Sequence, residues 1–153
     1  MKKTAIVRKN EISFCDILDN LRKNPKISKC GAIVSFIGIV RKVGHDKEEV
    51  SKLIYEHAED YVEQDLIEIR DYILSNYDVE EVLIYHFTGE LNPGDYTIFI
   101  VVAAQHRGPA FEATREALEL VKKKVHIWKK EITTKSEYWI LGDEIVDMHK
   151  SNK

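Results

Sequence analysis

The feature that most constrains the fold of this chain is an unbroken run of apolar residues at positions 98–104. A helix that crosses a membrane needs about 20 apolar residues, so this run is far too short to be one. Its length suits a β-strand, and a strand that is apolar on both faces belongs in the centre of a sheet. We therefore expect a globular domain built around this buried strand.

The remaining periodicity predicts helices and further strands around the central strand. Helices are expected over 14–21 and 62–77 and from Pro109 to about 125, where apolar residues recur every three or four positions. Further strands are expected at 4–8, 31–40, 52–57, 81–87, 128–134 and 137–141. This order predicts an α+β fold with helices packed on a mostly antiparallel sheet. At 153 residues with 44 % apolar composition, the chain suits a single compact domain over residues 1–153.

Three local signals predict where the chain starts a helix, bends or turns. Ser13 stands at the start of a capping box ahead of the first helix. Gly38 lies inside a predicted strand, where glycine often marks a bulge or a place where a ligand approaches the backbone. Pro93 and Gly94 occupy the two central positions of an expected type II turn, which predicts a hairpin into the central strand.

Composition excludes several classes of protein. The formal net charge of −3 and the sequence pI near 6.1 do not fit a protein that coats nucleic acid. Cys15 and Cys30 lack the spacing of a zinc site or a disulfide scaffold. The N-terminus turns polar too soon for a secretory signal peptide. We expect a soluble cytoplasmic domain with no metal, no cofactor, and neither a membrane nor a nucleic acid as its partner.

The charges are unevenly distributed along the chain. Residues 56–90 hold eleven acidic residues and one basic residue, Arg70, whereas residues 122–135 hold six lysines and one acid, Glu131. Cations gathered in one short stretch of a nearly neutral chain indicate a local anion site or a face for an acidic partner. The alternative is a solvated helix end, because lysines also favour the C-terminal end of the helix dipole.

Two groups of residues are candidates for an anion site. His106 and Arg107 fall between the central strand and the next helix, where unpaired backbone N–H groups bind anions readily. Arginine can bind a phosphate or carboxylate through two hydrogen bonds, and histidine can donate a hydrogen bond or move a proton. The alternative for this pair is an ordinary surface turn. The second group is Lys122 with Lys129, which Arg41 would join if its strand lies beside the central strand.

Short motifs along the chain also carry a family resemblance. In order, they are Phe36-Ile37-Gly38-Ile39-Val40-Arg41, Tyr55-Glu56-His57, Gly89-Glu90-Leu91 with Pro93-Gly94-Asp95, His106-Arg107 with Phe111-Glu112-Ala113, and Trp128-Lys129-Lys130-Glu131. Each motif alone is weak, but their common order is specific. Over residues 31–142, the chain resembles the large, catalytic subunit of molybdopterin synthase.

The resemblance implies a fold, a reaction and partners. The fold would be of the α/β-hammerhead kind. The reaction would be the conversion of cyclic pyranopterin monophosphate to molybdopterin, in which two sulfurs are installed as a dithiolene. The sulfur would arrive on the thiocarboxylated Gly-Gly tail of a small ubiquitin-like carrier subunit. Two large subunits would form a homodimer, each binding one carrier, so that the complex is a heterotetramer.

The resemblance also implies roles for particular residues. Lys122 and Lys129 would be the catalytic lysines at the end of the carrier tail. The implied substrate-binding residues are Ile39, Val40, Arg41, His106, Arg107, Lys122, Lys129, Lys130 and Glu131.

The chain departs from the family pattern at two positions, and two alternative functions stay open. Ile39 replaces the usual threonine, so a contact through a hydroxyl is lost there, and His126 stands where proline is common. From the residues alone, the lysine stretch also fits a non-catalytic anion-binding or RNA-binding module, although exposed aromatic residues beside the lysines are few. A phosphate-ester hydrolase is the second alternative, but the sequence shows no set of metal ligands and no activated nucleophile other than lysine for such a reaction.

Overall fold

The apolar run at 98–104 lies within strand β5, which is the second strand of an eight-stranded sheet in the described part of the chain. The computed structural model describes residues 1–141 and 144–147. Its elements are β1 (Thr4–Arg8), α1 (Phe14–Arg22), η1 (Pro25–Lys29), β2 (Ala32–Ile39), η2 (His45–Lys47), β3 (Val50–His57), α2 (Val62–Asn76), β4 (Glu81–Leu91), β5 (Tyr96–Ala104), α3 (Arg107–Lys124), β6 (Ile127–Thr133), β7 (Glu137–Leu141) and β8 (Glu144–Asp147).

The sheet has the strand order β2-β5-β4-β3-β6-β7-β8, and β1 pairs with β4 outside this path. The β1–β4 pair is parallel, and the pairs along the main path are antiparallel. The prediction of helices on a mostly antiparallel sheet is therefore confirmed. None of the helices in the described part is long and apolar enough to cross a membrane.

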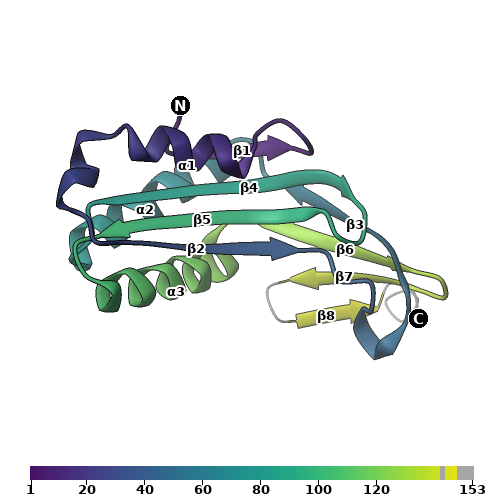
Figure 1. The fold of residues 1–153 in the computed structure, drawn as a ribbon. Helices are drawn as coiled ribbons and strands as arrows, with labels where there is room; N and C mark the ends of the chain where they lie inside the picture. The colour runs from purple at the N-terminus through teal and green to yellow at the C-terminus, as the bar shows by residue number, and fades with distance from the viewer. Residues whose placement is uncertain (142–143, 148–153) are drawn as a thin grey trace.

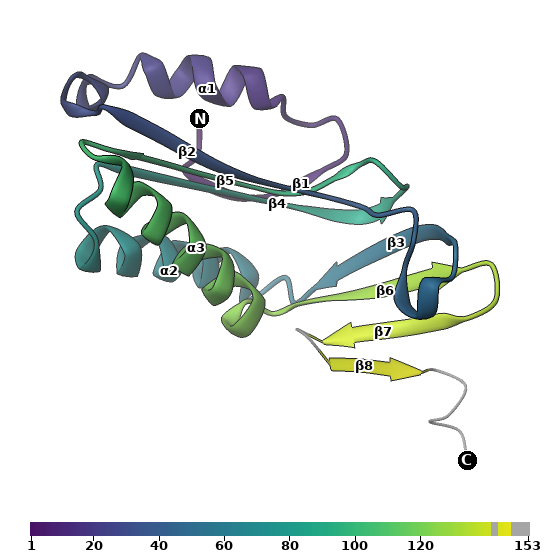
Figure 2. The same cartoon turned by 60° about the horizontal axis from the view of Figure 1, so that its bottom comes forward.

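Strand β4 belongs to both halves of the sheet. Its residues 81–86 pair with β5, whereas its residues 89–91 pair with β3. Gly89, with φ of 87°, lies where the pairing changes, and φ in this region favours glycine. Figure 2 shows the consequence, because β3, β6, β7 and β8 turn away from the plane of β2, β5 and β4.

Helices cover both faces of the first half of the sheet. Helix α1 lies on one face, and helices α2 and α3 lie side by side on the other (Figures 1 and 2). Side chains alternate along β4 and β5, so each face has its own core. Tyr85 and Phe99 belong to the core under α1, whereas Ile84 and Ile100 belong to the core under α2 and α3.

The turn and the bulge form as expected. Gly94 has φ of 91°, and the N–H of Asp95 donates to the carbonyl oxygen of Asn92 at 2.9 Å. The register between β2 and β5 shifts at Gly38 and Ile39, which is the irregularity that a glycine inside the strand predicts.

Other local predictions were incomplete or wrong. Ser13 occupies the N-cap position of α1 but forms no capping hydrogen bond through its side chain, so the capping box is absent. Strand β4 continues to Leu91 instead of ending at 87 because its last residues gain β3 as a second partner. Strand β8 was not expected, and the loop at 42–50 contains the short helix η2.

Candidate active site

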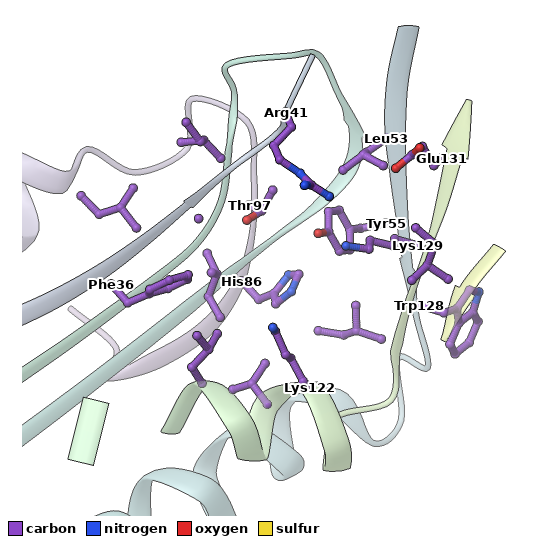
Figure 3. A pocket seen from close by; sticks show the side chains of 18 of the residues that line it. Phe36, Arg41, Leu53, Tyr55, His86, Thr97, Lys122, Trp128, Lys129 and Glu131 are labelled. Atoms are coloured by element: carbon purple, nitrogen blue, oxygen red, sulfur yellow. The ribbon is translucent and has the colours of Figure 1, made fainter. Parts of the chain in front are cut away.

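A cavity of about 420 Å³ opens in the bend of the sheet, beside the C-terminal end of α3. Strands β2, β5, β4, β3 and β6 all contribute side chains to its wall. Figure 3 shows these side chains converging from the two halves of the sheet and from the helix below them. Because the cavity lies where β4 changes partners, residues far apart in the sequence meet there.

Three cationic residues line the cavity, and each comes from a different element. Arg41 follows β2, Lys122 lies on the last turn of α3, and Lys129 lies on β6 opposite Tyr55. Arg41 and Lys122 are exposed, whereas Lys129 is half-buried. Strand β2 pairs with the central strand β5. This pairing was the condition under which Arg41 was expected to join the two lysines. The cavity wall carries these three cations and one carboxylate, Glu131. The excess of positive charge favours binding of an anion.

Apolar side chains form a large part of the remaining wall. The close packing of β2 on β5 depends on Gly38, because a Cβ there would lie 2.3 Å from Thr97 Oγ1 and 2.9 Å from Ile98 Cγ2. Larger side chains on either side of Gly38 then border the cavity. The apolar lining residues include Phe36, Ile37, Ile39, Leu118, Val121 and Ile140. A partly apolar molecule that carries negative charge fits this combination.

Tyr55 contributes a neutral hydroxyl to the cavity. Burial raises the pKa of Tyr55 to about 12, and a side-chain hydrogen bond with Thr97 opposes that rise. The phenol therefore keeps its proton at neutral pH and acts as a hydrogen-bonding group without charge.

His86 is a buried histidine in the same wall, with 7 % of its surface exposed. Its Nδ1 lies 2.7 Å from the carbonyl oxygen of Phe87. Burial, with a smaller contribution from the nearby Lys129 and His57, lowers the pKa of His86 to about 4, while the hydrogen bond to Phe87 opposes the shift. The imidazole is therefore neutral at pH 7.

Glu131 joins the cavity wall to the loop after Arg41. The Glu131 side chain is 6 % exposed and lines the cavity. Its Oε1 accepts a hydrogen bond from the backbone N–H of His45 at 2.8 Å. This carboxylate therefore fixes the segment that contains η2 at the edge of the cavity, beside Val43 and Arg41.

Val40 and Lys130 do not line the cavity, so the expectation that both bind substrate stays a prediction without support from this cavity. The Val40 side chain belongs to the core under α1. Its N–H donates to Asp95 at 2.9 Å, and its carbonyl accepts from Gly94 at 2.8 Å, so both backbone groups are used in the hairpin turn. Lys130 follows Lys129 on a strand, so it faces the other way, and its Nζ lies 3.0 Å from Glu137 Oε2.

His106 and Arg107 also lie away from this cavity within one chain. His106 is the N-cap of α3 and Arg107 is its first residue, whereas Lys122 lies near the other end of this 18-residue helix. A rise of 1.5 Å per residue separates Arg107 from Lys122 by roughly 22 Å. Within one chain, the structure therefore keeps apart the two candidate anion groups, which the family resemblance assigns to one substrate.

The sequence reasoning missed Tyr55, His86 and Thr97 as cavity residues. A signal was present for His86, because it is a polar residue within the apolar stretch of β4. A polar residue buried in such a stretch is expected to form a hydrogen bond or to serve a site.

Comparisons with known proteins agree on one family. A family model described as MoaE protein matches residues 7–124. The molybdopterin synthase catalytic subunit of Pyrococcus abyssi is 40 % identical over 123 residues, which cover 80 % of this chain and 82 % of that protein. The corresponding subunit of Bacillus subtilis is 37 % identical over 127 residues, which cover 83 % of this chain and 80 % of that protein.

Solved structures show the same fold. The crystal structure of molybdopterin synthase from Staphylococcus aureus matches with a TM-score of 0.80 at 31 % identity, over 92 % of this chain and 98 % of that chain. A chain from the complex of subunits 1 and 2 of molybdopterin-converting factor from Helicobacter pylori matches with a TM-score of 0.70. That chain is 17 % identical, and the match covers 96 % of this chain and 90 % of that one, so it supports the fold.

Proposed function

This chain belongs to the MoaE family of molybdopterin synthase catalytic subunits, and on that premise we propose that cyclic pyranopterin monophosphate binds in the cavity lined by Arg41, Lys122 and Lys129. The observation that carries this proposal is the convergence of these three cations from β2, α3 and β6 on one partly apolar cavity. The apolar wall suits a pterin ring system, and the cations suit its phosphate and the carrier's thiocarboxylate.

Lys122 and Lys129 act as the catalytic residues in this proposal. When the thiocarboxylate sulfur attacks a substrate carbon, a C–S bond forms, and the negative charge of the thiocarboxylate passes to the substrate oxygen whose bond to that carbon breaks. When water then attacks the resulting thioester, negative charge develops on the carrier's carbonyl oxygen, and the sulfur stays on the substrate as the C–S bond to the carrier breaks. Fixed cations placed where that charge develops stabilise the transition state more than they stabilise the bound substrate, and so they lower the activation barrier. Arg41 binds substrate through two hydrogen bonds to an anionic group, and Ile39 and Glu131 shape the wall beside it.

The proposed partner is a small ubiquitin-like carrier with a Gly-Gly tail. The Helicobacter pylori structure is a complex of two subunits of molybdopterin-converting factor, which supports a two-subunit enzyme here. A tail without side chains can enter a cavity of about 420 Å³ together with a pterin. Membership of the family favours this partner over the nucleic acid that the RNA-binding alternative would require.

We also place a homodimer interface along β2 in this proposal. β2 is the outermost strand of the sheet, and its Ile33 and Ile37 are exposed. Phe111, near the start of α3, is 61 % exposed. An edge strand with exposed apolar residues is a ready surface for pairing with another chain.

In this dimer, His106 and Arg107 of one copy would contribute to the active site of the other copy. Ala32, at the start of β2, pairs with Ala104 and so lies near His106, whereas Gly38, at the end of β2, lines the cavity. Two copies that meet antiparallel along β2 bring the start of one strand to the end of the other. His106 and Arg107 of one copy then approach the cavity of the second copy.

The proposal extends to the whole chain and its location. All strands of the described part join in one sheet, which supports a single domain over residues 1–153, although 142–143 and 148–153 lie outside the described residues. The family function uses a soluble substrate and a soluble carrier, which supports a cytoplasmic enzyme.

The proposed function is tested by reconstitution. The purified chain, a carrier bearing a C-terminal thiocarboxylate and cyclic pyranopterin monophosphate should together form molybdopterin, and omission of any one component should abolish it. Formation of molybdopterin at the same rate by a variant that lacks both Lys122 and Lys129 would contradict the proposed site.

A further inference from the structure

His86 presents one ring nitrogen, Nε2, to the cavity as a hydrogen-bond acceptor. A carbonyl oxygen only accepts hydrogen bonds, so the 2.7 Å contact between His86 Nδ1 and Phe87 O places the proton on Nδ1. In a neutral imidazole, Nε2 then carries a lone pair and is an acceptor. The proton position is thus fixed by the backbone of β4 itself.

The lone pair of Nε2 is open to the cavity. Nδ1 accounts for the hydrogen bond of the ring, and Nε2 forms none with the described residues. No buried side-chain nitrogen or oxygen in that part of the chain lacks a partner, so Nε2 must be reachable from the cavity that His86 lines.

The ring is also held in a fixed direction. His86 sits on β4 between Ile98 of β5 and Ile6 of β1, so its backbone is paired on both sides. The imidazole and the ring of Tyr55 lie in an edge-to-face arrangement, with their centroids 4.9 Å apart and an angle of 71° between the ring planes. Figure 3 shows Lys122 extending from α3 toward this ring.

We propose that His86 is a positioning residue of this enzyme, whose Nε2 accepts a hydrogen bond from the ammonium group of Lys122 once this exposed side chain turns toward the ring. The inference rests on the proposed function, in which Lys122 is catalytic. A neutral acceptor suits this task better than a carboxylate, because it fixes a flexible ammonium without cancelling the charge that the thiocarboxylate must meet. The imidazole remains neutral beside Lys122 and Lys129 because burial disfavours a further positive charge there.

A spectroscopic test does not depend on turnover. In the ¹⁵N spectrum of the full chain with labelled histidines, the His86 signals can be assigned by their loss in His86→Gln. Lys122→Ala should move the Nε2 resonance of His86, and Lys123→Ala, which changes a neighbouring exposed lysine outside the cavity, should leave it in place. An Nε2 resonance that ignores Lys122→Ala overturns the inference.

Two substitutions then separate the functions of the two ring nitrogens. The amide nitrogen of asparagine can replace Nδ1 and keep the bond to Phe87, but no atom replaces Nε2. The amide oxygen of glutamine can replace the Nε2 acceptor, but the bond to Phe87 is lost. We expect His86→Asn to lower the rate of molybdopterin formation roughly ten- to a hundredfold through kcat, as loss of one charge-assisted hydrogen bond predicts, and His86→Gln to retain most of it.

The outcomes distinguish this inference from the proposed function. A near-normal rate in His86→Asn with a large loss in His86→Gln would show that only the Nδ1 bond matters, and it overturns the inference alone. If His86→Asn does not fold, the rate of His86→Gln decides, because a loss comparable to that of Lys122→Ala overturns the inference. A normal rate in Lys122→Ala overturns the proposed catalytic role of Lys122, and this inference with it.

Discussion

The carboxylate of Glu131 occupies the space that a side chain at position 44 would need. A Cβ on Gly44 would lie 2.0 Å from Glu131 Oε1 and 2.6 Å from Val50 Cγ2. The same oxygen accepts the hydrogen bond from His45 N–H. Gly44 and Glu131 are therefore complementary, since the absence of a side chain at one position lets the carboxylate at the other hold the loop beside Arg41.

Removal of this carboxylate should loosen the loop and weaken substrate binding. We expect Glu131→Ala to lower the free energy of unfolding by about 1.5–3 kcal/mol, the range for a hydrogen bond to a charged group. Gly44→Ala should act in the same direction, because it displaces the carboxylate. Glu131→Gln keeps an acceptor for His45 N–H and should lose less. Denaturant unfolding and calorimetry with the pterin phosphate measure both effects, and unchanged affinity in Glu131→Ala would refute the coupling.

The two lysines of the cavity should differ sharply from their neighbours. Loss of a group that stabilises developing charge typically lowers the rate by about 10²–10³, so Lys122→Ala and Lys129→Ala should each abolish most molybdopterin formation. Lys123→Ala and Lys130→Ala are matched controls, because these residues lie outside the cavity wall. Their rates should stay near wild type. Equal, mild losses in all of these variants would indicate diffuse attraction of an acidic carrier instead.

Arg41 should act mainly on substrate affinity. The loss of a charge-assisted contact with a bound anion costs about 1.5–3 kcal/mol, which corresponds to a roughly ten- to hundredfold weaker affinity. Arg41→Ala should therefore weaken binding of cyclic pyranopterin monophosphate in calorimetry. Its thermal stability should match wild type, because Arg41 is exposed. Full affinity in this variant would place the phosphate elsewhere.

Subunit mixing tests whether Arg107 serves the cavity of a second copy. Lys122→Ala and Arg107→Ala should each be nearly inactive as pure homodimers. In a mixed dimer, one site then combines an intact Lys122 with an intact Arg107 from the other copy, so random mixing should restore about a quarter of the wild-type rate. If Lys122 and Arg107 act within one copy, every site of the mixed dimer has a lesion and no activity returns.

The fold was largely predictable because its strongest signals are local. The apolar run of β5 and the turn at Pro93 and Gly94 act over a few residues, and both appear as expected. Strand β8 carries only a short apolar pair between acidic residues, and it forms because β7 offers an edge. Such pairing depends on tertiary context, which a single sequence does not display.

The site was predictable in part for a different reason. The meeting of Arg41 with Lys122 and Lys129 depends on the pairing of β2 with β5, which was the condition stated for it. Lys130 was placed with Lys129 because the motif is continuous in sequence, although neighbours on a strand point to opposite faces. Val40 was expected to bind substrate beside Arg41, but it packs in the core, because the bulge at Gly38 changes which side chains turn toward the core.

Acid should destabilise the folded chain partly through His86. The pKa of His86 falls to about 4 in the folded state, against about 6.5 for histidine in an unfolded chain. Between these values, the unfolded state binds a proton that the folded state does not, so stability is complete above pH 6.5 and is lost as the pH falls toward 4. A shift of this size corresponds to about 3 kcal/mol. His86→Gln removes this titration, so the difference in unfolding free energy between wild type and variant should be constant above pH 7 and should shift against wild type below it. Denaturant unfolding from pH 4 to 8 measures this difference, and parallel curves for the two proteins would show that His86 can charge in the folded state.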